Sequence, residues 1–424
     1  MKRLKYKTEV NRENVNESST CILEKEFLVN HSPKKLIYIY IRFFIVYFTL
    51  SLSISYLTIY LPIYLLSILD VNRSNLAFIQ ILTYSFLFLA PLFAIIYDKY
   101  SYQKRKILSF MIVSFILSFI GALSLFSILF IFGILLGLNL FTHEAIKVGM
   151  GRLIIESSST EDMKDKILII INASSNIGAY IPPLIFLSVV TDIFNLDLWS
   201  NFFLIGGISL IPIIFSIFYK NYPQNIPEKK KIRNSERNSS RFYYSQIFLL
   251  SLSFIMIFSD KLYSYPFGNW ILSRYGQLGI SLLSGSYVIF LLLNTLGHIM
   301  GKWIAKKLKR KNIILLTNIV YICITLLMVF STSIIFLLII YSLTWFVSGI
   351  MMLNYISLHI NFCRNVEYQA TSYQILRVGI AIASVIFIPI GTFLSSFTST
   401  EFLILIAGGL ALLSLIPLFF LKNI

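Results

Sequence analysis

The amino-acid sequence predicts an all-α polytopic membrane protein with twelve transmembrane helices in two pseudo-symmetric six-helix bundles. Three observations support this prediction. Apolar residues make up 57% of the 424 residues and charged residues 13%, whereas soluble domains hold about 45–50% and about 25%. The apolar residues gather in runs that match the roughly 20 residues needed to cross a bilayer as a helix. The 36 Lys and Arg residues, against 19 Asp and Glu, lie in short segments between these runs.

Each expected span is an apolar run of sufficient length that polar or charged residues bound on both sides. The polar, mixed-charge segment before the first run is expected to be a flexible tail, because it lacks the apolar stretch of a cleavable signal peptide. In chain order, the expected spans are 40–66, 75–97, 107–126, 129–155, 167–190, 199–219, 244–266, 281–304, 313–331, 333–357, 373–396 and 401–421.

The distribution of positive charge gives the orientation of these spans. The loops after spans two, six and eight are rich in Lys and Arg, whereas the loops after spans one and seven hold only Arg73 and Arg274. Because loops with excess positive charge stay on the cytoplasmic side, both termini are expected in the cytoplasm of a multi-pass plasma-membrane protein. The net charge of +17 therefore indicates topology and predicts no nucleic-acid partner.

A basic, polar segment divides the chain into two halves. We expect a cytoplasmic tail at 1–36, an N-terminal bundle at 37–219, a linker at 220–243 and a C-terminal bundle at 244–424. Two pairs of landmarks, Ala94 with Gly301 and Pro182 with Pro389, share one offset of 207 residues. A shared offset favours an internal repeat and hence the 6+6 arrangement.

The sequence predicts no cofactor, metal site or nucleotide-driven pump. The three cysteines, Cys21, Cys323 and Cys363, are widely separated and form no CxxC pair. The phosphate-binding pattern G-x-x-x-x-G-K-[ST] does not occur in the sequence.

One motif follows span two and partly recurs after span eight. From Ala94 the chain reads AIIYDKYSYQKRK, which includes Asp98, Lys99 and Arg105. From Gly301 it reads GKWIAKKLKRK, which keeps the glycine and bases such as Arg310 but places Ala305 at the acid position. An acid at the C-terminal end of a helix faces an unfavourable dipole, so Asp98 is expected to meet a cation or the N-terminus of another helix.

These motifs and the topology resemble the major facilitator superfamily (MFS), whose corresponding motif is G-x-x-x-D-[RK]-x-G-[RK]-[RK]; in this chain, Ala94 and Ser101 replace the two glycines. The resemblance implies a secondary transporter that moves a small organic solute by alternating access, coupled to a proton or another ion, and acts as a monomer. It also implies a gating role for five residues: Asp98, Lys99, Arg105, Gly301 and Arg310.

Ionisable residues within spans are functional candidates because their insertion costs about 2.5–3.5 kcal/mol on translocon scales. Span four contains His143, Glu144 and Lys147, and Glu144 and Lys147 are close enough along a helix to form a pair. Span seven contains Asp260 and Lys261, of which at least one is expected to need a partner on another span.

Other polar residues in the spans are expected either to line a site or to mark membrane edges. The candidates for a polar site at mid-membrane are Asn172, Asn176, Asn294 and Trp345. Hydrogen bonds between helices are the alternative explanation for the amides. Arg377 and Arg42 lie near the ends of spans eleven and one and are expected at the interface.

Three alternative functions remain open from the sequence. A proton-dependent oligopeptide symporter is favoured by the segment INASSNIGAYIPPLI of span five, which is similar to the fifth span of that family. A lipid flippase would share the same fold. A polytopic lipid-modifying enzyme would need a reactive group at a membrane face; the acids Glu156, Glu161, Asp162 and Asp165 are more simply interpreted as a polar turn, so no enzyme activity is expected.

Overall fold

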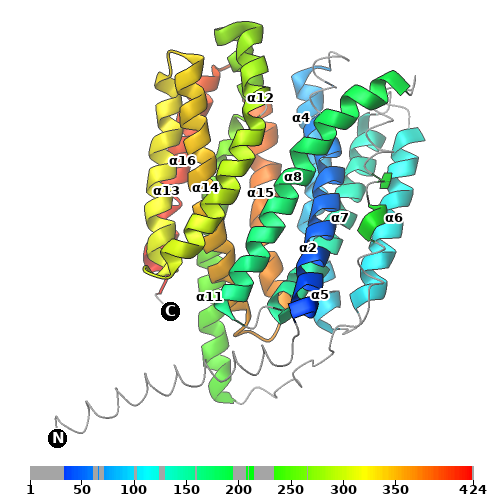
Figure 1. The fold of residues 1–424 in the computed structure, drawn as a ribbon, viewed down its shortest axis with the longest axis vertical. Helices are drawn as coiled ribbons and strands as arrows, with labels where there is room; N and C mark the ends of the chain where they lie inside the picture. The colour runs from blue at the N-terminus through cyan, green and yellow to red at the C-terminus, as the bar shows by residue number, and fades with distance from the viewer. Residues whose placement is uncertain are drawn as a thin grey trace, which may run out of the picture.

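The computed structural model describes residues 33–60, 65, 71–99, 103–123, 129–157, 160–193, 207–208, 210–213, 234–264 and 266–422. Every regular element in these ranges is a helix, and the helices run roughly alongside one another as a bundle (Figure 1). Each expected span coincides with a described helix or helix pair except the sixth, 199–219, most of which lies outside the described residues. Residues 1–32 of the expected tail and 220–233 of the expected linker also lie outside them.

The N-terminal half contains α2 (Pro33–Ser55) with η1 (Tyr56–Tyr60), α4 (Arg73–Ser85) with η2 (Phe86–Leu89) and α5 (Ala90–Lys99), α6 (Gln103–Leu123), α7 (Leu129–Ser157) and α8 (Glu161–Ile193). Side-chain caps start two of these helices. The Ser74 amide donates to Asn72 Oδ1 (3.1 Å) at the start of α4, and the Met163 amide donates to Thr160 Oγ1 (3.2 Å) at the start of α8.

The C-terminal half contains α11 (Asn234–Ile257) with η3 (Phe258–Leu262), α12 (Pro266–Ala305), α13 (Arg310–Leu327) with η4 (Met328–Phe330), α14 (Ile334–Cys363), α15 (Gln369–Leu394), α16 (Thr400–Leu412) and α17 (Leu415–Phe420). Helix α11 begins at Asn234, so the last ten residues of the expected linker are helical rather than extended. Helix α12 is interrupted at Gly276, whose φ of 66° lies in the left-handed region that glycine adopts without steric cost.

The outer surface of the bundle is apolar. Large side chains such as Phe248 (63% exposed), Leu292 (61%) and Phe330 (69%) point away from the protein interior. Among the described residues, nine helices are long and apolar enough to cross a membrane. An apolar surface of this extent is stable only against lipid.

Helix α15 lies in the middle of the bundle and packs against α4, α5 and α7 of the other half, while α12 and α14 pack against α8 (Figure 1). At one end of the molecule, α5 and α12 end. Helices α8, α13 and α15 begin at the same end. We call it the basic end, because Lys99 at the end of α5 and the Lys- and Arg-rich segment between α12 and α13 lie there. The other end is called the opposite end.

Glycines allow α12 and α14 to approach closely within the C-terminal half. A Cβ atom at Gly349 would lie 2.2 Å from the Asn294 carbonyl oxygen, and one at Gly297 would lie 2.2 Å from the Phe346 carbonyl oxygen. This approach brings the Asn294 side chain to the backbone of α14, where it donates to the Trp345 carbonyl oxygen (3.0 Å).

Candidate transport site

A charged cluster joins the two halves near the centre of the bundle. Lys147 Nζ lies 2.6 Å from Glu144 Oε1, and both residues belong to α7. Arg377 of α15 donates to the same carboxylate, with Nε 3.2 Å from Oε2 and Nη2 3.3 Å from Oε1. At a rise of 1.5 Å per residue, the three residues lie about 12–20 Å from the helix ends at the basic end.

The cluster is enclosed but not sealed. The side chains of Lys147, Glu144 and Arg377 keep 14%, 16% and 20% of their surface exposed. The Arg377 guanidinium also interacts with the Tyr373 hydroxyl of its own helix and lies within electrostatic range of Tyr47 on α2. These groups can therefore contact a small molecule between the halves.

The expectation that Arg377 lies at the interface is wrong. Counting from the apolar run placed Arg377 one turn into span eleven, but α15 begins at Gln369, which moves Arg377 two turns inward. The sequence signal that was available is its pairing potential: a lone arginine within a span needs an acid at similar depth, and Glu144 was the acid nearest a span centre.

His143 faces away from this cluster. Its ring nitrogens lie 2.7 Å from Ser53 Oγ, 2.7 Å from the Asn139 carbonyl oxygen and 3.3 Å from Ser114 Oγ, all within the N-terminal half. The side chain is fully buried. The geometry therefore places His143 in the packing of α7 against α2 and α6, apart from Glu144.

The predicted amides meet at a second junction between the halves. Asn294 Oδ1 accepts hydrogen bonds from Asn172 Nδ2 (2.9 Å) and Asn176 Nδ2 (3.1 Å), both on α8. Trp345 contributes its backbone carbonyl to Asn294, and its ring stacks on Phe290. Asn172, Asn176 and Asn294 thus form a polar bridge from α8 to α12.

Asp260 and Lys261 lie in η3, away from the bundle centre. Tyr321 of α13 donates to Asp260 Oδ2 (3.0 Å), which supplies the partner on another span that the sequence predicted. Lys261 Nζ lies 5.6 Å from the centre of the Phe258 ring. The structure brings neither residue to the Glu144 cluster.

Asp98 connects the halves at the basic end. Its carboxylate accepts hydrogen bonds from the Ala370 amide (2.9 Å), the Thr371 amide (2.8 Å) and the Thr371 hydroxyl (2.8 Å). Asp98 lies in the last turn of α5, and these donors lie in the first turn of α15, so the acid caps a helix of the other half. The partner of Asp98 is thus the N-terminus of another helix, which is one of the two kinds of partner expected from the helix dipole.

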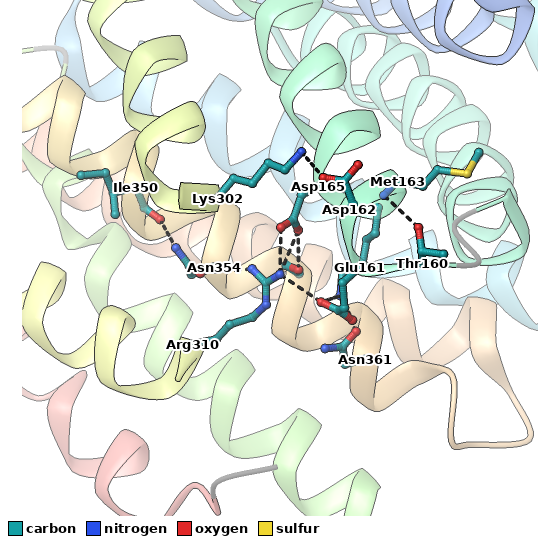
Figure 2. Close-up of polar contacts among 12 residues, drawn as sticks. Thr160, Glu161, Asp162, Met163, Asp165, Lys302, Arg310, Ile350, Asn354 and Asn361 are labelled. Carbon is teal, nitrogen blue, oxygen red and sulfur yellow. Dashed lines mark hydrogen bonds and ion pairs between the residues drawn. The ribbon is translucent and has the colours of Figure 1, made fainter. Parts of the chain in front are cut away.

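A second set of contacts at the basic end joins α8 to α12 and α13 (Figure 2). Lys302 Nζ lies 2.6 Å from Asp162, and Arg310 lies 2.9 Å from Asp165 and 3.0 Å from Glu161. Reading these three acids as part of a polar turn was wrong: they form the first turns of α8, where negative charge is favourable, and they pair with bases of the other half.

Helix α14 completes this second set. Ser357 Oγ donates to Asp165 Oδ1 (3.0 Å), Arg310 Nη1 donates to Asn354 Oδ1 (3.2 Å), and Lys164 donates to Asn361 Oδ1. The close approach of Gly301 to α14 holds α12 beside this network, since a Cβ atom there would lie 3.1 Å from the Ile350 carbonyl oxygen.

The ionisable groups at the start of α8 are shifted by their surroundings. Burial raises the pKa of Glu161, but the Lys164 and Arg310 charges outweigh it, so the pKa lies below the ordinary 4.5. The pKa of Asp162 is likewise lowered, since its hydrogen bonds to Lys166 and Lys302 outweigh burial. Burial lowers the pKa of Lys164 to about 8, although Glu161 partly offsets it.

The halves also touch at the opposite end. Arg73, at the start of α4, donates to the Ser395 carbonyl oxygen (2.8 Å) just after α15. Thr392 Oγ1 donates to Gln80 Oε1 (3.1 Å) one turn further in. The central cluster therefore lies between two separate groups of contacts that each join the halves.

Of the other predicted residues, Lys99 ends α5 at the basic end, while the side chain of Arg105 lies outside the described residues. No group of three or more His, Cys, Asp or Glu side chains within the described ranges could hold a metal ion.

The fold matches solved transporters. Human organic anion transporter MFSD10 is 14% identical with a TM-score of 0.67 (92% of this chain and 100% of that chain covered). A bacterial homologue of the iron transporter ferroportin, in its outward-facing state, is 13% identical to this chain with a TM-score of 0.67. The match covers 90% of this chain and 99% of that chain. The E. coli fucose:proton symporter FucP, in its outward conformation, is 12% identical to this chain with a TM-score of 0.63. The match covers 91% of this chain and 99% of that chain. At such identities the likeness shows the fold alone.

A comparison with curated protein sequences gave no match. The model of the Major Facilitator Superfamily matches residues 43–373, most of the chain. The expected all-α fold of the 6+6 type is confirmed, and the expectation that the chain is a transporter rather than an enzyme is confirmed with it. The chain belongs to the Major Facilitator Superfamily and is a multi-pass secondary transporter.

Proposed function

We propose that this transporter carries a small organic solute across the plasma membrane by alternating access, driven by a proton gradient. One observation carries the proposal: a partly exposed charged cluster from both halves lies between two separate groups of contacts that join those halves. A solute held at the cluster reaches one side when the contacts at one end break, and the other side when those at the other end break.

The basic end is proposed to face the cytoplasm. The segment between α12 and α13, which lies at this end, is rich in Lys and Arg, and such loops remain on the cytoplasmic side during insertion. Asp98 and the Arg310 network then form a cytoplasmic gate, and the Arg73 contact forms an external gate. A single chain supplies both halves of the site, so the proposed transporting unit is a monomer.

Glu144 is the group through which we propose that protons couple to transport. Its carboxylate joins the halves through Arg377 and lies beside Lys147 of its own helix. A solute that occupies Arg377 would separate it from Glu144. The released carboxylate can then take up a proton from the side to which the site is open and carry it through the cycle.

The test is transport by purified protein in proteoliposomes with an imposed pH gradient, using a panel of radiolabelled solutes. Glu144→Gln carries no ionisable proton, so it should lose gradient-driven accumulation while keeping exchange of solute across the membrane. Glu367→Gln, at an exposed acid before α15, removes the same charge and should transport like the wild type. Full accumulation by a well-folded Glu144→Gln protein would remove Glu144 from the coupling mechanism.

A further inference from the structure

The central cluster carries one uncompensated positive charge. Lys147 and Arg377 contribute two cations, and in the described part of the chain Glu144 is the one carboxylate that pairs with either of them. The second cation is unfavourable inside a membrane protein, because desolvation of a charge without a partner destabilises the fold. A cluster that served packing alone would balance its charges.

An unused hydrogen-bond donor lies within electrostatic range of this excess charge. The Tyr47 hydroxyl is buried and has no hydrogen-bond partner, although it lies within electrostatic range of both Arg377 and Glu144. A buried polar group without a partner destabilises the fold. The cluster thus combines a surplus cation, an unsatisfied phenol and side chains that remain partly exposed.

We propose that Arg377, Lys147 and Tyr47 form the binding site for the carboxylate of a small organic monoanion, which makes such an acid the transported substrate. The proposal deepens the transport function proposed above and rests on it. One negative charge restores neutrality in the cluster, and a carboxylate oxygen can accept the hydrogen bond that Tyr47 cannot otherwise donate. The guanidinium of Arg377 can hold a carboxylate through two parallel hydrogen bonds, the geometry in which it now holds Glu144.

The same geometry explains how substrate and Glu144 compete. Glu144 occupies the Arg377 fork in this conformation. When an incoming carboxylate takes the fork, Glu144 remains beside Lys147 and stays ionised until it takes up its proton. Substrate binding therefore exchanges one carboxylate for another at Arg377 and loosens the tie between α7 and α15. A neutral solute cannot make this exchange, because it offers no charge to replace Glu144.

The test measures binding to the purified full-length protein, without any gradient. Three acids are each paired with the amide of the same shape: lactate with lactamide, benzoate with benzamide, and nicotinate with nicotinamide. We expect at least one acid to raise the melting temperature saturably and its amide to leave it unchanged. Equal effects of an acid and its amide, or no effect of any acid, would overturn the proposal.

Substitutions test whether the acid binds at the central cluster. Arg377→Gln should weaken binding of the acid by about 10–100-fold, the loss expected for a charge-assisted hydrogen bond. Lys306→Gln removes one positive charge from an exposed position at the basic end and should bind normally. Unchanged affinity in Arg377→Gln would refute the assignment.

Tyr47→Phe keeps the test decisive if Arg377→Gln fails to fold. Its hydroxyl has no partner in the free protein, so the variant should melt no lower than the wild type yet bind the acid about 3–10-fold more weakly, as loss of one hydrogen bond predicts. Wild-type affinity in this variant would exclude the phenol from the site.

Transport measurements distinguish failure of the proposed anion site from failure of the proposed transport function. Specific binding of an acid without its movement across a liposome membrane would contradict the transport function and leave the anion site standing. Transport of a neutral solute by Arg377→Gln at the wild-type rate, with no acid bound, would overturn the anion site and leave the transport function standing.

Discussion

Asp98→Asn should open the basic end without disturbing the fold. The wild-type carboxylate accepts three hydrogen bonds from the first turn of α15, at 2.8–2.9 Å. Hydrogen bonds to charged groups contribute about 1.5–3 kcal/mol each, and the charge at a helix N-terminus adds about 0.3–1 kcal/mol. Asparagine keeps one acceptor oxygen, so it retains part of this set and loses the charge.

The loss amounts to about 2 kcal/mol once the partial exposure of Asp98 is allowed for. This free energy shifts the equilibrium toward the open basic end about 30-fold, at 1.4 kcal/mol per factor of ten. Cys363 provides a natural reporter, because it ends α14, is fully buried and lies within electrostatic range of Asp98. With Cys21 and Cys323 replaced by serine, a maleimide can modify only Cys363.

The assay is the initial rate of maleimide labelling of purified protein. We expect Asp98→Asn to label about 30-fold faster than the wild type, because labelling follows the population with an open basic end. Glu367→Gln removes an exposed carboxylate near the same helix end and should label at the wild-type rate. Equal rates for Asp98→Asn and the wild type, with matching melting temperatures, would refute the role of the cap.

Three further outcomes follow from the geometry. Gly349→Ala should lower stability by about 1–3 kcal/mol, because its Cβ would strike the Asn294 carbonyl, whereas Gly409→Ala has open space and should melt normally. Arg310→Met should speed maleimide labelling by leaving Asp165 buried without its cation, and a second change, Asp165→Leu, should restore much of the loss. The acids in the first turn of α8 have a lowered pKa, so they stay ionised near neutral pH. Closure of the basic end, measured by fluorescence energy transfer across it, should therefore stay constant from pH 7 to about 5 and weaken below about 4.5 as these acids bind protons.

The fold could be predicted because the bilayer imposes simple rules on length and charge. A run of about 20 apolar residues specifies a span, and basic loops specify its orientation. The helix ends were harder, since polar residues extend helices beyond the membrane. Helix α15 begins at Gln369 rather than 373, and α11 begins at Asn234 rather than 244. Hydropathy carries no information about a helix once its residues leave the lipid.

The contacts of the candidate site within one helix could be predicted from the sequence, whereas its contacts between helices could not. The Glu144–Lys147 pair follows from helical spacing, and the shared face of Asn172 and Asn176 does too. Their partners in the other half, Arg377 and Asn294, depend on how the halves dock, which no local pattern encodes. Asn294 was a candidate on polarity alone, whereas an arginine near a helix end looked like a membrane-edge residue until the helix was extended.

Both copies of the motif contact the N-terminus of a helix in the other half, the first through an acid and the second through bases. At the offset of 207 residues, Asp98 corresponds to Ala305, and the first turn of α15 corresponds to the first turn of α8. The first turn of α15 holds no acid, so its N-terminus accepts Asp98 as a cap. The first turn of α8 already carries Glu161 and Asp162, and an acid at 305 would be repelled by them. An uncharged Ala305 removes this repulsion, and the bases of α12 and α13 then bind the α8 acids directly.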